Sequence, residues 1–496
     1  MNILYRAGGS KNNYQVDLLE ELRQKGGFDR CTVVVMNDEN DVYPSEFYHV
    51  LYSAEGYFCK YGQNIYELPA ISYDMWEALL PYKDDMLNMT QRAAHNHVLN
   101  YFEMDDQYMK HIRYWNWILD SDEIGMAYFT VAPHTCWEYA IYALCKVKGI
   151  PTLIVDELWQ MKLAPVFTNL EHNGINVRKC FESHETIELD ANLQAWYDKT
   201  RSAGTSYNPA RIKANIKANR SFEKKNFMGS FSEDAKAVAI QVARYIVRGR
   251  TTGDDLEWTY RFRKQRIQAR RKYKKDKPKE YYDKRFAVHP VEGEEYILYL
   301  LQQMPEATLL PKSGVASNQL VPIELLADAA AKRGVKLYVK EHYVQLPRDH
   351  TFYTELLKIP NVRLIKLSDP TGPIQDKALA IASQNGTCLA EGLVKGIPIM
   401  CTAPSVMAEA PNAFRIRDEK SVLDAIDAIR AGFTIDPEAN KKYFAAFGKT
   451  CIRHFLDWKE DMPYDKSVMA KDSIDLILKF QAAGMPEDFY YEREDV

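Results

Sequence analysis

The stretch from residue 296 to residue 401 constrains the fold of this chain more than any other feature. Apolar, strand-like segments alternate there with helix-like segments. The strand-like segments are 296–301, 335–339, 362–365, 378–382 and 397–400, and the helix-like segments are 320–333 and 351–357. Such alternation predicts a parallel sheet with helices on both faces. Ligands of such sheets bind at the carboxyl ends of the strands, so the polar residues that follow these segments are the first candidates for a site.

The first 195 residues predict a second α/β unit. Strand-like segments are 2–5, 31–36, 126–131 and 152–155, and helix-like segments are 14–25, 74–119 with an interruption near Asn88, and 137–147. The segment from 126 to 155 reads as a βαβ unit, for which a right-handed crossover is expected. We therefore expect two Rossmann-like α/β domains that face a cleft.

The remaining segments differ in composition from these two units. Residues 196–290 are rich in lysine and arginine and predict a basic helical linker. The predicted domains are thus 1–195, the linker 196–290, a second α/β domain at 291–435, and C-terminal helices at 436–496. Residues 491–496 are expected to form a frayed end.

Composition excludes several classes of protein. The 496 residues carry a net charge of −4, with 46% apolar and 27% charged residues, as in soluble globular proteins. No nucleic-acid partner is expected from that charge. No segment has the roughly 20 apolar residues that span a bilayer, and no signal peptide is visible. Eight scattered cysteines without a Cys-x-x-Cys pair argue against a zinc cluster and predict a cytoplasmic protein.

A nucleotide-binding loop is predicted where the segment 378–382 ends. Ser383, Asn385, Gly386 and Thr387 follow it, and a helix begins at once, so backbone N–H groups at the helix start are available to phosphate. Glu391 lies about one turn into that helix, within reach of a ribose hydroxyl. The alternative is an ordinary helix cap, with Gly386 in a tight turn.

Other strand ends offer candidate catalytic and binding groups. Lys340 and His342 follow the segment 335–339 and could bind phosphate or assist a leaving group. Glu306 follows the segment 296–301 and is a candidate catalytic carboxylate. His134 follows the segment 126–131 in the first domain. Each of these residues also has a structural alternative, as a surface-turn or capping residue.

Two further signals are weaker. The triplet Asp120-Ser-Asp122 matches a metal-binding Asp-x-Asp pattern but follows a long helix and resembles its last turn, so no metal site is predicted. The run 261–275 contains many basic and no acidic residues. A solvated linker is its commonest explanation, and contact with an anionic membrane, the inner membrane in particular, is a hypothesis. Dinucleotide-binding, P-loop, zincin and serine-hydrolase motifs are missing from the sequence.

The second α/β unit resembles a known family. Residues 299–314, Asn318-Gln319, 337–342, 359–362, Asn385-Gly-Thr387, Glu391-Gly-Leu393 and Gly396-Ile-Pro398 appear in the order found in the capsular polysaccharide biosynthesis family. That family comprises glycosyltransferases of the two-domain GT-B type, including Kdo transferases. In the first domain, Tyr114-Trp115 and residues 131–138 are similar to it more loosely. The resemblance departs at Gln302, Met304 and Tyr343, where the family pattern has His, Gln and Pro.

The resemblance implies transfer of a sugar from a nucleotide-activated donor, with CMP favoured, to a surface or capsular glycan or glycolipid. It implies a metal-independent enzyme without a cofactor, whose donor site contains His342 and the Ser383 loop. Two alternatives stay open. One is a sugar-nucleotide epimerase or hydrolase on the same fold, and the other is a non-catalytic protein that binds a polyanion or glycan. An inactive member of the family would also fit the three departures.

Overall fold

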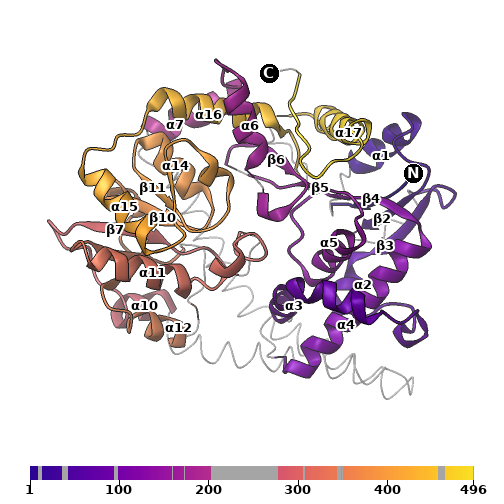
Figure 1. The fold of residues 1–496 in the computed structure, drawn as a ribbon, viewed down its shortest axis with the longest axis horizontal. Coiled ribbons are helices and arrows are strands. Elements are labelled where there is room, and N and C mark those ends of the chain that lie inside the picture. Colours follow the sequence, from indigo (N-terminus) through magenta and orange to yellow (C-terminus); the bar gives the residue numbers. More distant parts are fainter. Residues whose placement is uncertain are drawn as a thin grey trace, which may run out of the picture.

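The computed structural model describes residues 1–8, 14–35, 43–93, 99–158, 160–172, 174–202, 278–304, 308–342, 348, 350–455 and 464–494. Two α/β bodies lie side by side, the first in indigo and purple and the second in salmon and orange (Figure 1). The predicted GT-B-like fold, with two mostly parallel sheets flanked by helices, is confirmed. Glu306, Tyr343 and the basic run 261–275 lie outside the described residues.

The first sheet has seven strands in the order β13-β6-β5-β4-β1-β2-β3. Its strands are β1 (Asn2–Arg6), β2 (Cys31–Val35), β3 (Tyr48–Tyr52), β4 (Ile124–Phe129), β5 (Thr152–Val155), β6 (Ala164–Phe167) and β13 (Cys451–Ile452). The five strands from β5 to β3 pair in parallel, and β6 and β13 add an antiparallel edge. The central strands are buried along nearly their whole length, which explains their runs of apolar residues.

Helices cover both faces of this sheet. They are α1 (Tyr14–Gln24), α2 (Ser53–Phe58), α3 (Tyr73–Ala93), α4 (Tyr101–Ser121) and α5 (Cys136–Lys148), with the short turns η2 (Ile65–Glu67) and η3 (Leu170–His172). Residues of α3, α4 and α5 form one core with the sheet, and α1 forms the other. The helix α5 follows β4 directly, so its N-terminus lies at the carboxyl edge of the sheet.

The second sheet has six strands in the order β12-β11-β10-β7-β8-β9, all parallel. Its strands are β7 (Tyr296–Leu300), β8 (Lys336–Lys340), β9 (Val362–Ile365), β10 (Ala380–Ser383), β11 (Ile399–Cys401) and β12 (Ala413–Arg415). Its helices are α10 (Pro278–Arg285), α11 (Leu320–Ala331), α12 (His350–Leu356), α13 (Thr371–Gln375), α14 (Thr387–Lys395) and α15 (Glu419–Arg430), with turns η4 (Gly314–Ser317) and η5 (Val406–Glu409). The strand order reverses direction between β7 and β10, where Rossmann-like sheets bind their ligands.

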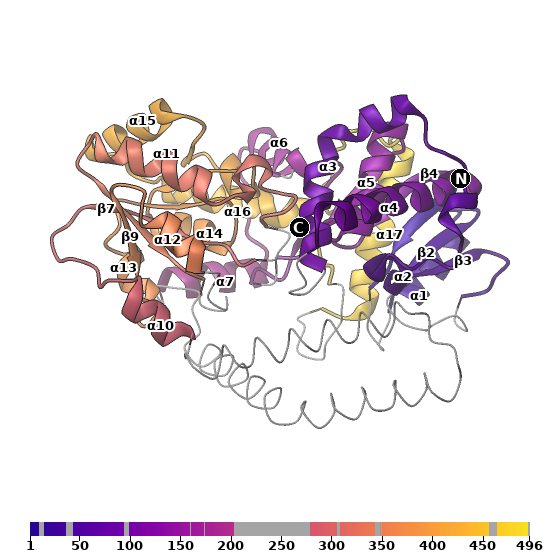
Figure 2. The ribbon, with the colours of Figure 1, turned by 90° about the horizontal axis from the view of Figure 1, so that it is seen from below.

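Four helices tie the two bodies together. They are α6 (Ile175–Ser183), α7 (Ala191–Ser202), α16 (Pro437–Thr450) and α17 (Lys466–Ala482). The first three pack with α14 in one core, while α17 returns to the first domain and packs beside α1 (Figures 1 and 2). No helix in the described part of the chain is long and apolar enough to cross a membrane.

Three sequence-based expectations need correction. The long helix does not break near Asn88, because α3 continues to Ala93 and α4 begins at Tyr101. The C-terminal segment is not frayed through residue 494: Tyr491 and Arg493 are buried, and the Tyr491 N–H donates to Asn176. Strands β3, β6, β12 and β13 were not predicted at all.

Candidate functional site

The carboxyl ends of the two sheets meet across the domain interface. Lys312, in the loop after β7, forms a buried ion pair with Asp156, which follows β5. A cavity of about 830 Å³ lies beside this contact, lined from the first domain by α3, α5 and the turn after β6, and from the second by the loops after β7, β11 and β12. Ligand sites in proteins are typically of this size and occur at domain interfaces.

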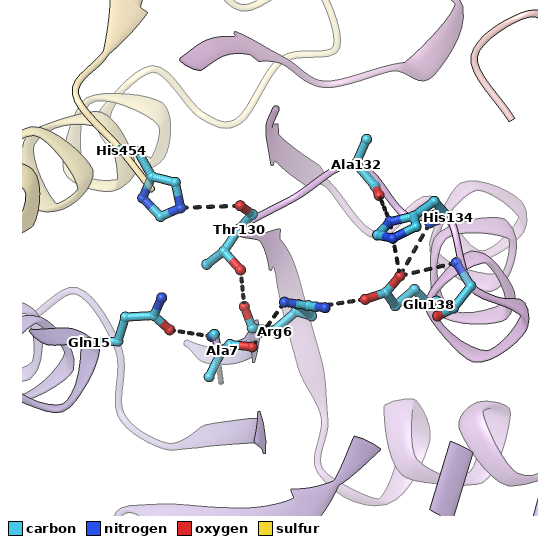
Figure 3. Close-up of polar contacts among 10 residues, drawn as sticks. Arg6, Ala7, Gln15, Thr130, Ala132, His134, Glu138 and His454 are labelled. Carbon is cyan, nitrogen blue, oxygen red and sulfur yellow. Dashed lines mark hydrogen bonds and ion pairs between the residues drawn. The ribbon is translucent and has the colours of Figure 1, made fainter. Parts of the chain in front are cut away.

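In the first domain, a buried ion pair joins the end of β1 to the first turn of α5. Arg6 is the last residue of β1, and its Nε donates to Glu138 Oε1 at 2.7 Å (Figure 3). Both side chains are almost fully buried. Burial raises the pKa of the Glu138 carboxyl, but Arg6, together with His134, outweighs it and holds the pKa at about 2. Glu138 is therefore ionised at neutral pH.

Glu138 also orients His134. Its Oε2 accepts the backbone N–H groups of His134 and Thr135 at 3.2 and 3.1 Å, which caps the N-terminus of α5. The His134 Nδ1 donates to the carbonyl of Ala132 at 2.7 Å and lies 3.5 Å from Glu138 Oε2. Because a carbonyl can only accept, this contact places the proton on Nδ1 and leaves Nε2 as an acceptor. The side chain is 30% exposed, so the imidazole is not sealed inside the fold.

His454, in the C-terminal part of the chain, contacts the end of β4. His454 is fully buried, and its Nε2 lies 3.1 Å from the carbonyl of Thr130 (Figure 3). Its Nδ1 lies 3.0 Å from the Tyr14 hydroxyl. Burial lowers the pKa of His454 to about 4, so this imidazole is neutral at physiological pH. The Thr130 hydroxyl in turn donates to the carbonyl of Arg6 at 2.7 Å. The chain segment that carries His134 is thus fixed by residues far apart in the sequence.

In the second domain, the predicted nucleotide loop forms as a strand-to-helix turn. Ser383 ends β10, and Thr387 begins α14. Ser383 is buried, and its hydroxyl donates to the Leu300 carbonyl at 3.0 Å and accepts from Gln302 at 2.6 Å. Asn385 accepts the Gly386 N–H at 3.0 Å. Ser383 therefore anchors the turn on its buried side, while Asn385, Gly386 and Thr387 are partly exposed.

Gly386 is required by the backbone of that turn. Its φ is +101° and its ψ is 170°, a conformation that only glycine adopts readily. A Cβ at this position would lie 2.9 Å from Gln302 Oε1. The glycine lets the chain turn directly from β10 into α14, and N–H groups at a helix start are the groups that bind phosphate in other proteins.

We therefore expect Gly386→Ala to lose nucleotide binding as well as stability. Strain and the contact with Gln302 should cost about 1–3 kcal/mol of unfolding free energy. Gly396→Ala is the matched control, since Gly396 ends the same helix at φ +77° and has open space around it. Thermal melting with and without nucleotide measures both effects. A nucleotide-induced rise in Tm that survives in Gly386→Ala would contradict the prediction.

The other predicted donor-site residues are more buried than expected. Lys340 is 3% exposed, and its ammonium donates to the carbonyls of Lys366 and Asp369 at 2.6 and 2.9 Å. Burial lowers its pKa to about 8. Glu341, also buried, accepts from Arg348 at 2.8 Å. His342 is partly exposed at the end of β8.

One strand, β7, separates the ends of β8 and β10. His342 and the Ser383 loop therefore lie at the same edge of the sheet but are not direct neighbours. Gln302, at the end of β7, connects them: its side chain binds Ser383, and its carbonyl accepts from Arg348 at 2.5 Å. Glu391 lies one turn into α14, as predicted, and is partly exposed. The binding roles of these residues remain predictions.

The cavity contains a carboxyl group that sequence reasoning missed. Asp85 of α3 accepts from the Tyr139 hydroxyl at 3.2 Å. Burial raises the pKa of Asp85 to about 6, against the lowering effect of Tyr139. Neither residue stands in a motif; only their helical positions, on α3 and α5, bring them to the same wall.

This shift predicts a pH-dependent stability. Between about pH 4 and pH 6 the folded protein keeps a proton on Asp85 that the unfolded chain has released, so stability falls as pH rises through this window. Asp85→Asn should therefore stabilise the protein above pH 6, by on the order of 2 kcal/mol, and leave it unchanged near pH 4. Denaturant unfolding of both proteins at several pH values measures this. Equal stability at pH 8 would show that Asp85 is not held in a desolvated position.

One described group has metal-ligand chemistry. Cys180 and His184 on or next to α6 and Glu492 of the C-terminal segment have their ligand atoms within 4.8 Å of one another. His184 Nδ1 is also 3.1 Å from the carbonyl of Cys180, and Lys449 lies 3.9 Å from Glu492. These contacts account for the group without a metal. Asp122 of the Asp-x-Asp triplet accepts from Thr32 and contacts His49, both at 2.6 Å, which are structural roles.

Solved structures that are similar to this chain match it at low sequence identity and low TM-score. A β-Kdo 2,7-transferase, KpsC from Thermosulfurimonas dismutans, is 15% identical over 39% of this chain, with a TM-score of 0.24, and this chain spans 56% of it. A UDP-GlcNAc 2-epimerase from Neisseria meningitidis is 11% identical over 97% of this chain and 100% of its own, with a TM-score of 0.27. A glycosyltransferase from Rickettsia africae is 10% identical over 98% of each chain, with a TM-score of 0.24.

No protein-family model matches the chain, and no curated protein matches its sequence. Identities and TM-scores this low support no argument about activity. The function must therefore be argued from the residues of this chain.

Proposed function

We propose that this protein is a glycosyltransferase that moves a sugar from a nucleotide-activated donor, CMP-linked in the favoured case, to a surface or capsular glycan. The observation that carries the proposal is that two strand-end clusters lie beside one interdomain cavity, each directly next to residues that line it. The second domain contributes the glycine-led start of α14, and the first contributes His134 held by Glu138. A fold of this type hosts several chemistries, so the assignment depends on these groups and not on the architecture.

The second domain would hold the donor. The first N–H groups of α14 would bind the phosphate of the nucleotide, and the positive end of the helix would stabilise the negative charge that grows as the phosphate leaves. Glu391 would bind a ribose hydroxyl, and His342 would assist at the phosphate. This arrangement stabilises the leaving group with protein dipoles alone.

The first domain would activate the acceptor. The Nε2 of His134 would take the proton from an acceptor hydroxyl as that oxygen forms a bond to the anomeric carbon of the donor sugar. The bond from that carbon to the phosphate oxygen breaks at the same time, and the nucleotide leaves with the electron pair. Glu138, ionised and 3.5 Å from Nδ1, would stabilise the imidazolium that results.

Nucleotide binding is the first test. We expect one of CMP, UDP, GDP and ADP to raise the Tm of the full chain, because a ligand that binds only the folded state stabilises it by mass action. At about 100 times Kd the gain is roughly 2.7 kcal/mol. The rise should be smaller in His342→Ala and unchanged in His289→Ala, an exposed histidine in the same domain. A folded sample that responds to none of the four would overturn the donor site.

Product analysis then separates transfer from the alternative reaction. The protein is incubated with the sugar nucleotide selected by the binding test, first alone and then with glycan acceptors. Transfer predicts that the sugar leaves the nucleotide in quantity only when an acceptor is present. A new sugar nucleotide, or free sugar at the same rate without an acceptor, would instead support an epimerase or hydrolase.

A further inference from the structure

We infer that the interdomain cavity binds an acidic sugar, with its ring against the tyrosines of α3 and α5 and its anionic group on Arg415 and Arg417. The anionic group is a carboxylate or a phosphate, which arginine recognises by the same paired hydrogen bonds. The role of this sugar as the acceptor rests on the proposed function. The binding of the sugar does not rest on the proposed function, and it can be measured without any sugar nucleotide.

One wall of the cavity is built from aromatic rings. Tyr82 of α3 contacts Tyr139 and Tyr142 of α5, with ring centroids 6.1 and 6.4 Å apart, and the two α5 rings are stacked at 5.8 Å. All three line the cavity. Rigid tyrosines offer an apolar face with a polar edge at a low entropy cost, which suits the CH face of a sugar ring. Asp85, on the same wall, is placed to accept from ring hydroxyls.

The opposite wall is rich in arginine. Arg178 and Arg415 share a single carboxylate, Glu409, at 2.9 and 2.6 Å. Arg417 also lines the cavity, and its guanidinium has no ion-pair partner among the described residues. Arg178 also lies 3.9 Å from Glu182, so the three arginines and these two glutamates together carry one positive charge in excess. Guanidinium groups recognise carboxylates and phosphates in pairs of hydrogen bonds, so this wall favours an anion.

The remaining charged groups of the cavity do not cancel this excess locally. Lys146 pairs with Glu487 at 3.1 Å, and Lys312 pairs with Asp156. Glu171 lies in the turn after β6, on the side of the first domain. Arg415 and Arg417 belong to the second domain and the tyrosines with Asp85 to the first, so a bound sugar would bridge the two domains.

The cavity adjoins both strand-end clusters. Its lining includes Cys401 and Ala403, and the Thr402 N–H between them donates to the carbonyl of Ser383 at 3.0 Å. The donor loop is thus the immediate neighbour of this wall. On the other side, α5 carries Tyr139 in its second turn, directly after Glu138, whose carboxylate orients His134. A sugar in the cavity would lie next to both halves of the proposed reaction.

Equilibrium binding to the full chain tests the inference without donor. The first pair of probes is a tetrasaccharide of galacturonic acid and its carboxyl-reduced counterpart, which is the same chain without charge. The second pair is glucose 6-phosphate and glucose, which tests phosphate as the anionic group. Titration calorimetry gives each affinity. We expect one acidic probe to bind at least about tenfold more tightly than its neutral partner, the factor expected for a charged hydrogen-bonding group.

Variants locate the binding. Arg417→Ala and Tyr82→Ala should each weaken the acidic probe by about tenfold or more, with little change in Tm, because both side chains are at least partly exposed. Arg333→Ala is the control, since Arg333 is an exposed arginine of the same domain paired with Asp427. Equal affinity for acidic and neutral probes, or unchanged affinity in both cavity variants, would overturn the inference.

The outcomes also separate this inference from the proposed function. Nucleotide binding that depends on Gly386, together with no binding of either acidic probe, would contradict the acidic-sugar site but not the proposed glycosyltransferase activity. Binding of an acidic probe that depends on Arg417, without transfer from any sugar nucleotide, would support the acidic-sugar site and contradict the proposed glycosyltransferase activity. A nucleotide whose affinity falls in Arg417→Ala but not in Gly386→Ala would show that the cavity holds the nucleotide instead.

Discussion

Replacing Arg6 by methionine is expected to cost the protein about 3–5 kcal/mol of unfolding free energy at neutral pH, the range measured when one partner of a buried ion pair is removed. Glu138 would keep two backbone hydrogen bonds, from His134 and Thr135, but would lose the cation that offsets its burial. A carboxylate desolvated in this way binds a proton instead of remaining charged. Guanidinium unfolding followed by tryptophan fluorescence measures the loss, since Trp115 and Trp137 lie in the core of this domain.

The pH dependence of the stability loss in Arg6→Met shows whether the buried charge of Glu138 causes it. In the parent protein the pKa of Glu138 is lowered to about 2. The ionised Glu138 therefore contributes fully to the free energy of unfolding above the ordinary pKa of a carboxyl group, and this contribution is lost only as the pH falls towards 2. In Arg6→Met the pKa of Glu138 should rise above its ordinary value, so that stability falls as pH increases. The difference between the two proteins should therefore grow from pH 4 to pH 8.

Two further variants act as controls. Arg6→Met combined with Glu138→Gln should recover most of the loss, because a neutral pair leaves no buried charge. Lys25→Met removes an exposed pair with Glu21 and should cost under about 1 kcal/mol. If Arg6→Met costs no more than Lys25→Met, the strand-end pair does not stabilise the first domain.

The sequence predicted the second domain well because its signals are local. Each strand of the second sheet except β12 was found within a few residues, and the helix α14 begins at Thr387, one residue before the predicted start. Buried parallel strands are continuous apolar runs, and the polar loop Ser383–Thr387 stands directly between two such elements. The placement of that loop at the strand end follows from topology alone.

The missed features depend on contacts between distant residues. The strand β13 has two residues, and it forms only because Cys451 and Ile452 pair with β6. Arg6 and Glu138 are 132 positions apart, and the shared Glu409 of the cavity is 231 positions from Arg178. The tail was expected to fray because it is a chain terminus, whereas Arg493 donates to the carbonyl of Gly448 inside the fold. No local pattern in a single sequence encodes such pairings.

The largest effect on activity is expected from His134→Ala. Loss of a general base typically lowers the rate by about 10²- to 10⁴-fold, and the imidazole should act through Nε2, since its Nδ1 is committed to Ala132. The nucleotide-induced rise in Tm should persist, because the donor loop lies in the other domain. The acidic probe should also still bind, because His134 does not line the cavity. The loss should therefore appear in kcat and not in either affinity.

A purely structural role for His134 predicts a different pattern. If His134 is the base, its removal should leave the Tm close to that of the parent, because the side chain is 30% exposed and its hydrogen bond is to the Ala132 carbonyl. If its role is structural, the Tm should fall. His49→Ala is a suitable control, because His49 is a partly exposed histidine of the same domain that contacts Asp122 away from the cavity. Full activity in His134→Ala, with donor and acceptor at saturating concentration, would exclude His134 as the base. A fall in activity that matches a fall in Tm would assign His134 to the cap of α5, because the lost activity would then follow the loss of folded protein.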